Sequence, residues 1–287
     1  DEAHAAGWDV LLDAAAFVPT NRLDLGRWKP DLVSLSFYKM FGYPTGVGCL
    51  LMRKPMFVKL SRPWFSGGTI QIASVQGDGH YLARDAAAFE DGTVDYLSLP
   101  AVEIGLRHLS AAGPDLIHER VRCLTGWLLE SLGRLLHRNG APLVQVHGPG
   151  DLEQRGGTIA FNFVDPDGES LDILRVQELA SEARISLRTG CFCNPGAGEI
   201  AYGLGRREIA EFFRGEEGMP FQELRARIRK TYGKEIGAIR ISVGLATNFA
   251  DVLSFIRFAR GFLDTTLAGM GEAKTGAGAG APMRDSA

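Results

Sequence analysis

An acid and an amine near the start of the chain could act together on one small molecule. Asp13 ends an apolar run that begins at Val10, and Lys39 ends one that begins at Leu32. Neighbouring strands of an α/β sheet end at one edge, where ligands bind. A carboxylate and an amine there suit a ring nitrogen and an aldehyde, the groups that pyridoxal 5'-phosphate (PLP) carries. The alternatives are a lysine that only reaches solvent and an aspartate that caps its own turn.

Two thiols lie in a glycine-rich stretch further along the chain. Cys191 and Cys193 follow Arg188 closely, and a nearby cation favours the thiolate, which is the nucleophilic form of cysteine. Two thiols at this spacing could instead bind a soft metal, but the sequence has no histidine or further cysteine nearby to complete four ligands. We therefore predict no metal site. Inert thiols are the other alternative.

A second arginine interrupts an apolar run at residues 238–243. Arg240 lies in the middle of this expected strand. A charge among apolar residues costs stability unless it is paired, and charges in clefts are often functional. The sequence therefore indicates either a structural ion pair or a site for an anionic ligand.

The elements that must position these residues alternate between strand-like and helix-like patterns. We expect strands at residues 8–12, 32–38, 144–148, 158–163, 185–187 and 238–243, and helices at 98–109, 114–139, 171–183, 201–213, 221–232 and 248–262. This alternation predicts an α/β fold with two domains, residues 1–110 and 111–267. The Gly/Ala-rich residues 268–287 are predicted to be a disordered tail.

Composition narrows the class of protein. The chain has 287 residues, of which 45% are hydrophobic and 23% charged, enough for a sizeable core. The net charge of −3 gives no reason to expect a nucleic acid or an acidic membrane surface as a partner, and no apolar run approaches the length of a membrane span. Four cysteines are too few for a disulfide framework in a chain of this length, so we expect reduced thiols and a cytoplasmic location.

Three stretches resemble the class V branch of the PLP-dependent aminotransferases. They are Leu11–Ala16, Ser36–Lys39 together with Pro44–Gly48, and Arg188–Gly196. Within this branch the chain is most similar to cysteine desulfurases and to the desulfurase domain of molybdenum cofactor sulfurases. The likeness extends to about Leu267. It implies fold type I, with the later part of a large domain, built on a mostly parallel sheet, followed by a smaller α/β domain.

The resemblance also implies roles for individual residues. Lys39 bonds the PLP aldehyde and moves protons, Asp13 bonds the ring nitrogen, and Ser36 contacts the phosphate. Thr69, in a Gly-Gly turn, is expected near the cofactor of a neighbouring subunit, so the resemblance implies a homodimer. Arg240, with Arg188, is expected to hold the amino-acid substrate.

The thiol loop has an implied role as well. Cys193 stands where desulfurases take sulfur from L-cysteine, forming a persulfide and releasing alanine, and Cys191 is the second candidate. A separate protein could then accept the sulfur. Gly198 stands where sulfurase-like sequences often have a further cysteine. A class V aminotransferase, lyase or epimerase without sulfur chemistry is therefore an alternative, as is an inactive family member.

The resemblance finally implies that more of the large domain precedes residue 1. That part is expected to carry the turn that holds the PLP phosphate and an aromatic residue that stacks on the ring. Without these groups, we expect residues 1–287 alone to retain PLP weakly or not at all.

Overall fold

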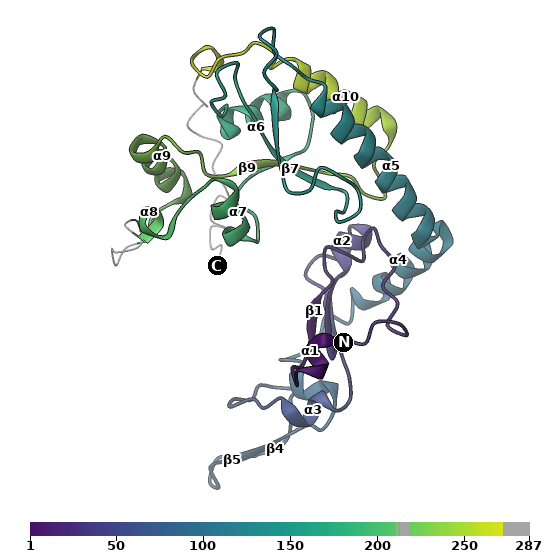
Figure 1. The fold of residues 1–287 in the computed structure, drawn as a ribbon. Coiled ribbons are helices and arrows are strands. Elements are labelled where there is room, and N and C mark those ends of the chain that lie inside the picture. Colours follow the sequence, from purple (N-terminus) through teal and green to yellow (C-terminus); the bar gives the residue numbers. More distant parts are fainter. Residues whose placement is uncertain (211, 213–217, 272–287) are drawn as a thin grey trace, which may run out of the picture. The chain divides into compact units, whose positions relative to one another are not determined.

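The computed structural model describes residues 1–210, 212 and 218–271. The chain divides into two compact units, Asp1–Val121 and Arg122–Ala287, and each is described by itself. Figure 1 shows the elements of both. The predicted boundary after residue 110 lies within helix α4 (Leu99–Ala112), N-terminal to this division. In the predicted tail, Ala268–Met270 forms a short 3-10 helix, while residues 272–287 lie outside the described residues.

A three-stranded sheet organises the first unit, in the order β1-β2-β3. After the short helix α1 (Glu2–Ala5), β1 (Leu11–Asp13) pairs in parallel with β2 (Leu32–Ser36). Strand β3 (Gly48–Met52) returns antiparallel to β2. A parallel return needs a crossover of a dozen or more residues, and the segment between Ser36 and Gly48 is too short for one. The sheet is therefore mixed, with the expected parallel pair at β1 and β2.

The lysine predicted at a strand end lies in a helix. Strand β2 stops at Ser36 and not at Tyr38, and α2 (Phe37–Phe41) follows at once, so the expected strand is too long and Lys39 belongs to α2. The helix ends at Gly42, which has φ 85°. The change from strand to helix bends the chain between Ser36 and Lys39.

Helix α4 packs closely on α2. A Cβ atom at the buried Gly105 of α4 would lie 2.3 Å from the ring of Phe41 in α2. Only glycine permits this approach without a shift of the ring. The position of the helix that carries Lys39 therefore depends on the size of residue 105.

A hairpin extends from the rest of the first unit (Figure 1). It joins β4 (Ile70–Ser74) to β5 (Gly79–Leu82), between the short helices α3 (Met56–Lys59) and η1 (Ala86–Phe89). Apolar side chains on the hairpin are exposed: Ile72, Val75 and Tyr81.

The second unit contains an antiparallel sheet in the order β6-β7-β9-β8. The strands are β6 (Val144–His147), β7 (Thr158–Phe163), β8 (Arg188–Gly190) and β9 (Ala238–Ser242). The predicted strand at residues 185–187 is misplaced by three residues, because pairing with β9 begins at Arg188 and ends at Gly190.

Six helices lie in or enter the described part of the second unit: α5 (Pro114–Gly133), α6 (Ile173–Glu182), α7 (Pro195–Ala201), α8 (Arg206–Ala210), α9 (Phe221–Tyr232) and α10 (Phe249–Arg260). Helix α5 ends before the predicted residue 139. The predicted helix 201–213 is replaced by α7 and α8, with residues 211 and 213 outside the described part. Asn248 caps α10 as predicted, since its side chain accepts the N–H groups of Ala250 and Asp251.

Aromatic side chains form the core of this unit. Helices α5 and α10 lie side by side (Figure 1), where the ring centroids of Trp127 and Phe249 are 4.9 Å apart. Phe163 of β7 stacks on Phe262 at 4.8 Å, and Phe161 meets Phe255 at 6.0 Å. These contacts fix α10 against the strand that neighbours Arg240 on β9.

Helix α9 is rich in basic residues, but not all of them face solvent. Arg225 is buried, and it donates to Glu235 at 2.6 Å and 2.8 Å and to Asp172 at 3.0 Å. The charge therefore holds α9 to the start of α6. No helix among the described residues is long and apolar enough to span a membrane.

Candidate functional site

The carboxylate of Asp13 is fixed at the end of β1 by two donors. Its Oδ1 atom accepts the N–H of Ala15 at 3.0 Å and the hydroxyl of Ser34 at 3.1 Å. Ser34 occupies the position on β2 that pairs with Asp13. The Ala15 N–H, the Ser34 hydroxyl and the charge of Lys39 lower the pKa of Asp13, although burial opposes them. The carboxylate is thus ionised at neutral pH.

Lys39 lies close enough to Asp13 for its charge to act there, yet it remains available. Among the described residues its Nζ atom makes no hydrogen bond or ion pair, and its one recorded contact is with the ring of Tyr38, 6.0 Å from the centroid. Ser36, at the last position of β2, is half-buried, and its hydroxyl is likewise without a partner in the described chain.

The turn that contains Thr69 is held together internally. The side chain of Thr69 is fully buried, and its hydroxyl donates to the carbonyl of Ser66 at 2.8 Å and accepts the Ser66 N–H at 3.0 Å. The carbonyl of Gly67 accepts the N–H of Gly92 at 2.8 Å. In this arrangement the hydroxyl of Thr69 is occupied within its own turn, and its predicted role toward a phosphate stays a prediction.

Two arginines face each other on the second sheet. Arg188 of β8 and Arg240 of β9 are directly paired in the antiparallel register. Side chains at such positions share a face with Cβ atoms roughly 5 Å apart, where like charges destabilise each other. Neither guanidinium has a hydrogen-bond or ion-pair partner in the described chain, and the Nε atom of Arg240 is buried. An anion between them would relieve the repulsion and satisfy these donors.

The ring of Phe192 covers part of Arg240. The guanidinium carbon of Arg240 lies 4.6 Å from the ring centroid, a distance typical of a cation–π contact. Phe192 stands between the two thiols, and both Cys191 and Cys193 are exposed and unbridged. Beyond them, Asn194 caps α7 by accepting the N–H of Ala197. The expected mobile loop is therefore held at both ends, by β8 and by α7.

The two thiols have different electrostatic surroundings. Desolvation raises the pKa of the Cys191 thiol, and the carboxylates of Glu199 and Glu235 raise it further. Burial also raises the pKa of Tyr202, with Cys191 and Glu235 contributing. Cys191 is thus in a setting that disfavours its thiolate. The described residues contain no group of three metal-ligating side chains around either thiol.

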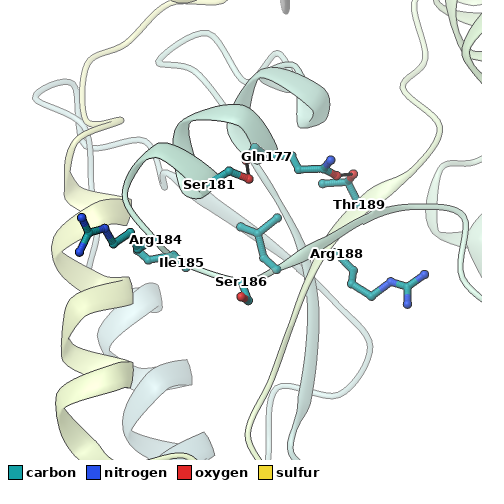
Figure 2. Close-up of a pocket in the computed structure, with 8 residues that line it drawn as sticks. Gln177, Ser181, Arg184, Ile185, Ser186, Arg188 and Thr189 are labelled. Carbon is teal, nitrogen blue, oxygen red and sulfur yellow. Dashed lines mark hydrogen bonds between the residues drawn. The ribbon is translucent and has the colours of Figure 1, made fainter. Parts of the chain in front are cut away.

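A polar cavity of about 680 Å³ lies behind β8. Figure 2 shows its lining, in which Gln177 of α6 and Thr189 of β8 are joined by a hydrogen bond. The side chains of Arg184 and Arg188 point away from each other (Figure 2), so they do not converge on one ligand. The cavity therefore does not by itself define a binding site.

The residues of the first unit fit a PLP-like group. The Oδ1 atom of Asp13 is occupied, but its Oδ2 atom has no hydrogen-bond partner within the described chain and can accept a proton-bearing ring nitrogen. Within the part of the chain that the structure describes, Lys39 offers an amine without an ion pair, and the hydroxyl of Ser36 has no hydrogen-bond partner. These are the donors and acceptors that the cofactor would need from this part of the chain.

The fold and these side chains define an α/β protein with a carboxylate, an amine and a thiol loop. The model of the family Aminotransferase class-V matches residues 1–255. The chain belongs to the aminotransferase class-V family, as the sequence motifs predicted.

Its relatives include molybdenum cofactor sulfurases. The Bos taurus protein is 35% identical over 258 residues, which cover 88% of this chain and 29% of the relative. The Homo sapiens protein is also 35% identical, with 97% of this chain and 32% of the relative covered. The chain thus spans about a third of the length of these sulfurases.

Solved cysteine desulfurases share the fold. The Thermococcus onnurineus enzyme has a TM-score of 0.65 at 21% identity, and CsdA of Escherichia coli has 0.65 at 18%. In both cases 91% of this chain and 54% of the solved chain are covered. The predicted fold class is confirmed.

Two residues of the site escaped the sequence analysis. Ser34 bonds Asp13, but only the register of β1 and β2 reveals it; alternation places residues 34 and 36 on one face and could have suggested it. Phe192 lies between the thiols, and the sequence pattern assigned it no role. Its contact with Arg240 depends on the pairing of β8 with β9, which no local pattern indicates.

Proposed function

We propose that the protein is a PLP-dependent enzyme that transfers sulfur from L-cysteine to Cys193. The observation that carries the proposal is the pair of exposed thiols next to Arg240, a guanidinium whose hydrogen-bond donors are unsatisfied in the described chain. Thiols beside a free carboxylate-binding group suit a sulfur-containing amino acid. The names of the related sulfurases and of the solved desulfurases support the same reaction class.

The reaction balances without a further oxidant. The carbon–sulfur bond of cysteine breaks, a sulfur–sulfur bond forms at Cys193, and a proton replaces sulfur on the carbon. The products are alanine and a persulfide on the protein. A sulfur-acceptor protein would later take the terminal sulfur. The Cys191 thiol is the alternative recipient of this sulfur.

Residues of the first unit would hold the cofactor. When bound, PLP supplies an aldehyde that bonds amines and a ring that stabilises negative charge. Asp13, kept ionised by its two donors, would accept the N–H of the ring nitrogen. Lys39 would bond the aldehyde and then carry a proton on Nζ, which is possible because no carboxylate in the described chain immobilises it. Ser36 would donate to the phosphate.

Residues of the second unit would hold the substrate and receive the sulfur. Arg240, with Arg188 opposite, would bind the α-carboxylate with paired N–H groups. Cys193 is the proposed nucleophile, because the surroundings of Cys191 raise the pKa of that thiol. We also propose a homodimer in which the turn of Thr69 and the exposed apolar hairpin β4–β5 meet a second subunit.

The experiment is cysteine turnover by the full-length protein. Alanine and sulfide are measured with L-cysteine and a thiol reductant, and the persulfide is located by mass spectrometry of alkylated peptides. We expect alanine formation in the wild type, its loss in Cys193→Ser and its retention in Cys191→Ser. Light scattering with size-exclusion chromatography measures the proposed dimer.

The alternatives give different results. Turnover of another amino acid with no sulfide would indicate an aminotransferase, lyase or epimerase, and absence of any PLP absorbance would indicate an inactive member. Either result overturns the proposal. So does full desulfurase activity in Cys193→Ser.

A further inference from the structure

Phe192 makes the recorded contact between the thiol loop and Arg240. Its ring lies 4.6 Å from the guanidinium carbon, while the loop backbone continues on either side into the two cysteines. An aromatic ring over a cation attracts it but accepts no conventional hydrogen bond, so the N–H groups of Arg240 remain available. One arginine can therefore bind a carboxylate and hold the ring at the same time.

The contact also compensates an electrostatic cost. Arg240 faces Arg188 across the strand pair, and its Nε atom is buried without a partner in the described chain. The ring quadrupole is the favourable interaction recorded for this cation. A bound carboxylate would compensate the same charge, so loss of the ring would mainly free the loop from its attachment to β9.

The chain on either side of Phe192 has other anchors, but they hold only its ends. β8 stops at Gly190, which has φ 113°, and α7 starts after Asn194. Residues 191–193 lie between these two elements. Phe192 thus gives the reactive stretch itself a contact with the sheet.

We infer that Phe192 is a positioning residue that anchors the thiol loop on Arg240, the residue proposed to bind the substrate carboxylate. The anchor ties the position of both thiols to the group that fixes the amino acid. This inference rests on the proposed function for its role in sulfur transfer, but the anchor itself does not.

The anchor is tested by trypsin cleavage after Arg188 in the full-length protein. Cleavage requires local opening of β8, which is an edge strand, and its rate follows the open population. Phe192→Leu keeps apolar volume and removes the ring, so we expect cleavage about 2- to 30-fold faster, the range for loss of a cation–π contact. Phe192→Tyr should restore the wild-type rate. Phe249→Leu, which removes a ring from α10, is the matched control and should leave the rate unchanged.

A double-mutant cycle shows whether the ring acts through the arginine. Arg240→Met should accelerate cleavage to a similar degree, and the double variant with Phe192→Leu should add little to either change. Rates equal to the wild type in Phe192→Leu, or multiplied effects in the double variant, would overturn the anchor.

The role in the reaction is measured separately. In a single turnover with L-cysteine, Phe192→Leu should form alanine about 2- to 30-fold more slowly, while the affinity for L-alanine stays within about 2-fold of the wild type. Tyrosine should restore the rate. Parallel loss of affinity and rate, or no change in rate, would overturn this role. If the wild type forms no alanine, the proposed function fails, and the trypsin result still decides the anchor.

Discussion

The hydroxyl of Ser34 donates a hydrogen bond to Asp13, 3.1 Å away on the neighbouring parallel strand. A donor to the ionised form of a carboxyl lowers its pKa. Together with the N–H of Ala15, this bond keeps Asp13 charged where a ring nitrogen is proposed to bind. The sheet register, and not a nearby sequence motif, provides it.

Removal of this hydroxyl should raise the pKa of Asp13. In Ser34→Ala the Ala15 N–H remains, so the pKa should rise toward its usual value, as measured by carbon-13 NMR of the carboxyl group. Only the ionised form of Asp13 is proposed to bind the ring nitrogen, so this interaction is lost as the pH falls through the pKa of Asp13. Because the pKa is higher in the variant, its PLP retention should fall at a higher pH than in the wild type. Ser36→Ala, whose hydroxyl does not contact Asp13, is the control for the pKa. An unchanged Asp13 titration would contradict the assignment.

The close approach of α2 and α4 gives a second prediction. Gly105→Ala brings a Cβ atom to 2.3 Å from the ring of Phe41. Overpacking costs about 1–3 kcal/mol, which exceeds the roughly 0.5–1 kcal/mol that alanine gains in a helix. In the full-length protein we expect lower stability in urea and less PLP fixed to Lys39 after borohydride reduction.

Two further variants test the cause. Phe41→Leu combined with Gly105→Ala should recover part of both losses, because the smaller side chain makes room. Gly133→Ala at the end of α5, where no atom lies within 4 Å, should be neutral or slightly stabilising. Equal effects at both glycines would show that the Phe41 contact is not the cause.

Several features of the molecule follow from local patterns. The apolar run that ends in Asp13 predicts the end of β1, and the Asn248 cap follows from the polar residue before an apolar helix. The end of β2 does not follow in this way. The run continues to Tyr38, but pairing with β3 stops at Ser36, and the chain then turns into α2.

Features that depend on distant partners escape such patterns. The apolar residues 185–187 look more strand-like than Arg188, yet the pairing with β9 selects residues 188–190. Arg225 looks like one more solvated charge on a basic helix. It is buried because Glu235 and Asp172, from other elements, pair with it.

This buried ion pair gives a third prediction. The side chains of Arg225 and Glu235 are each 8% exposed. Removing one partner of such a pair costs about 3–5 kcal/mol, so Arg225→Ala should lower the free energy of unfolding by this amount. Arg227→Ala is the matched control on the same helix, since its exposed pair with Glu223 should be worth only about 0.5 kcal/mol. Similar losses in urea unfolding would contradict the burial of Arg225.

The contact of Arg225 with Asp172 should make the free energy of unfolding depend on pH. Burial raises the pKa of Asp172, but the Arg175 N–H and the charge of Arg225 outweigh it and hold the pKa below its usual value. The carboxylate therefore contributes stability above its unfolded pKa of about 3.9, and this contribution is lost as the pH falls through the lower folded value. Urea unfolding is measured at about one-unit steps between about pH 3 and 6. The free energy of unfolding of Arg225→Ala should change less with pH over this range than that of the wild type. An unchanged slope would mean that Asp172 does not depend on Arg225.

The fifth prediction separates the two thiols by their surroundings. Desolvation and the carboxylates of Glu199 and Glu235 raise the pKa of Cys191 above its ordinary value. Glu199→Gln removes one negative charge, which makes the thiolate easier to form, so the pKa of Cys191 should fall. Peptide-resolved alkylation with iodoacetamide across pH measures this, because the rate follows the thiolate fraction. Glu153→Gln, an exposed change in another loop, should leave the profile unaltered. A profile that Glu199→Gln does not move would remove the electrostatic reason for assigning the nucleophile to Cys193 and would make Cys191 an equal candidate.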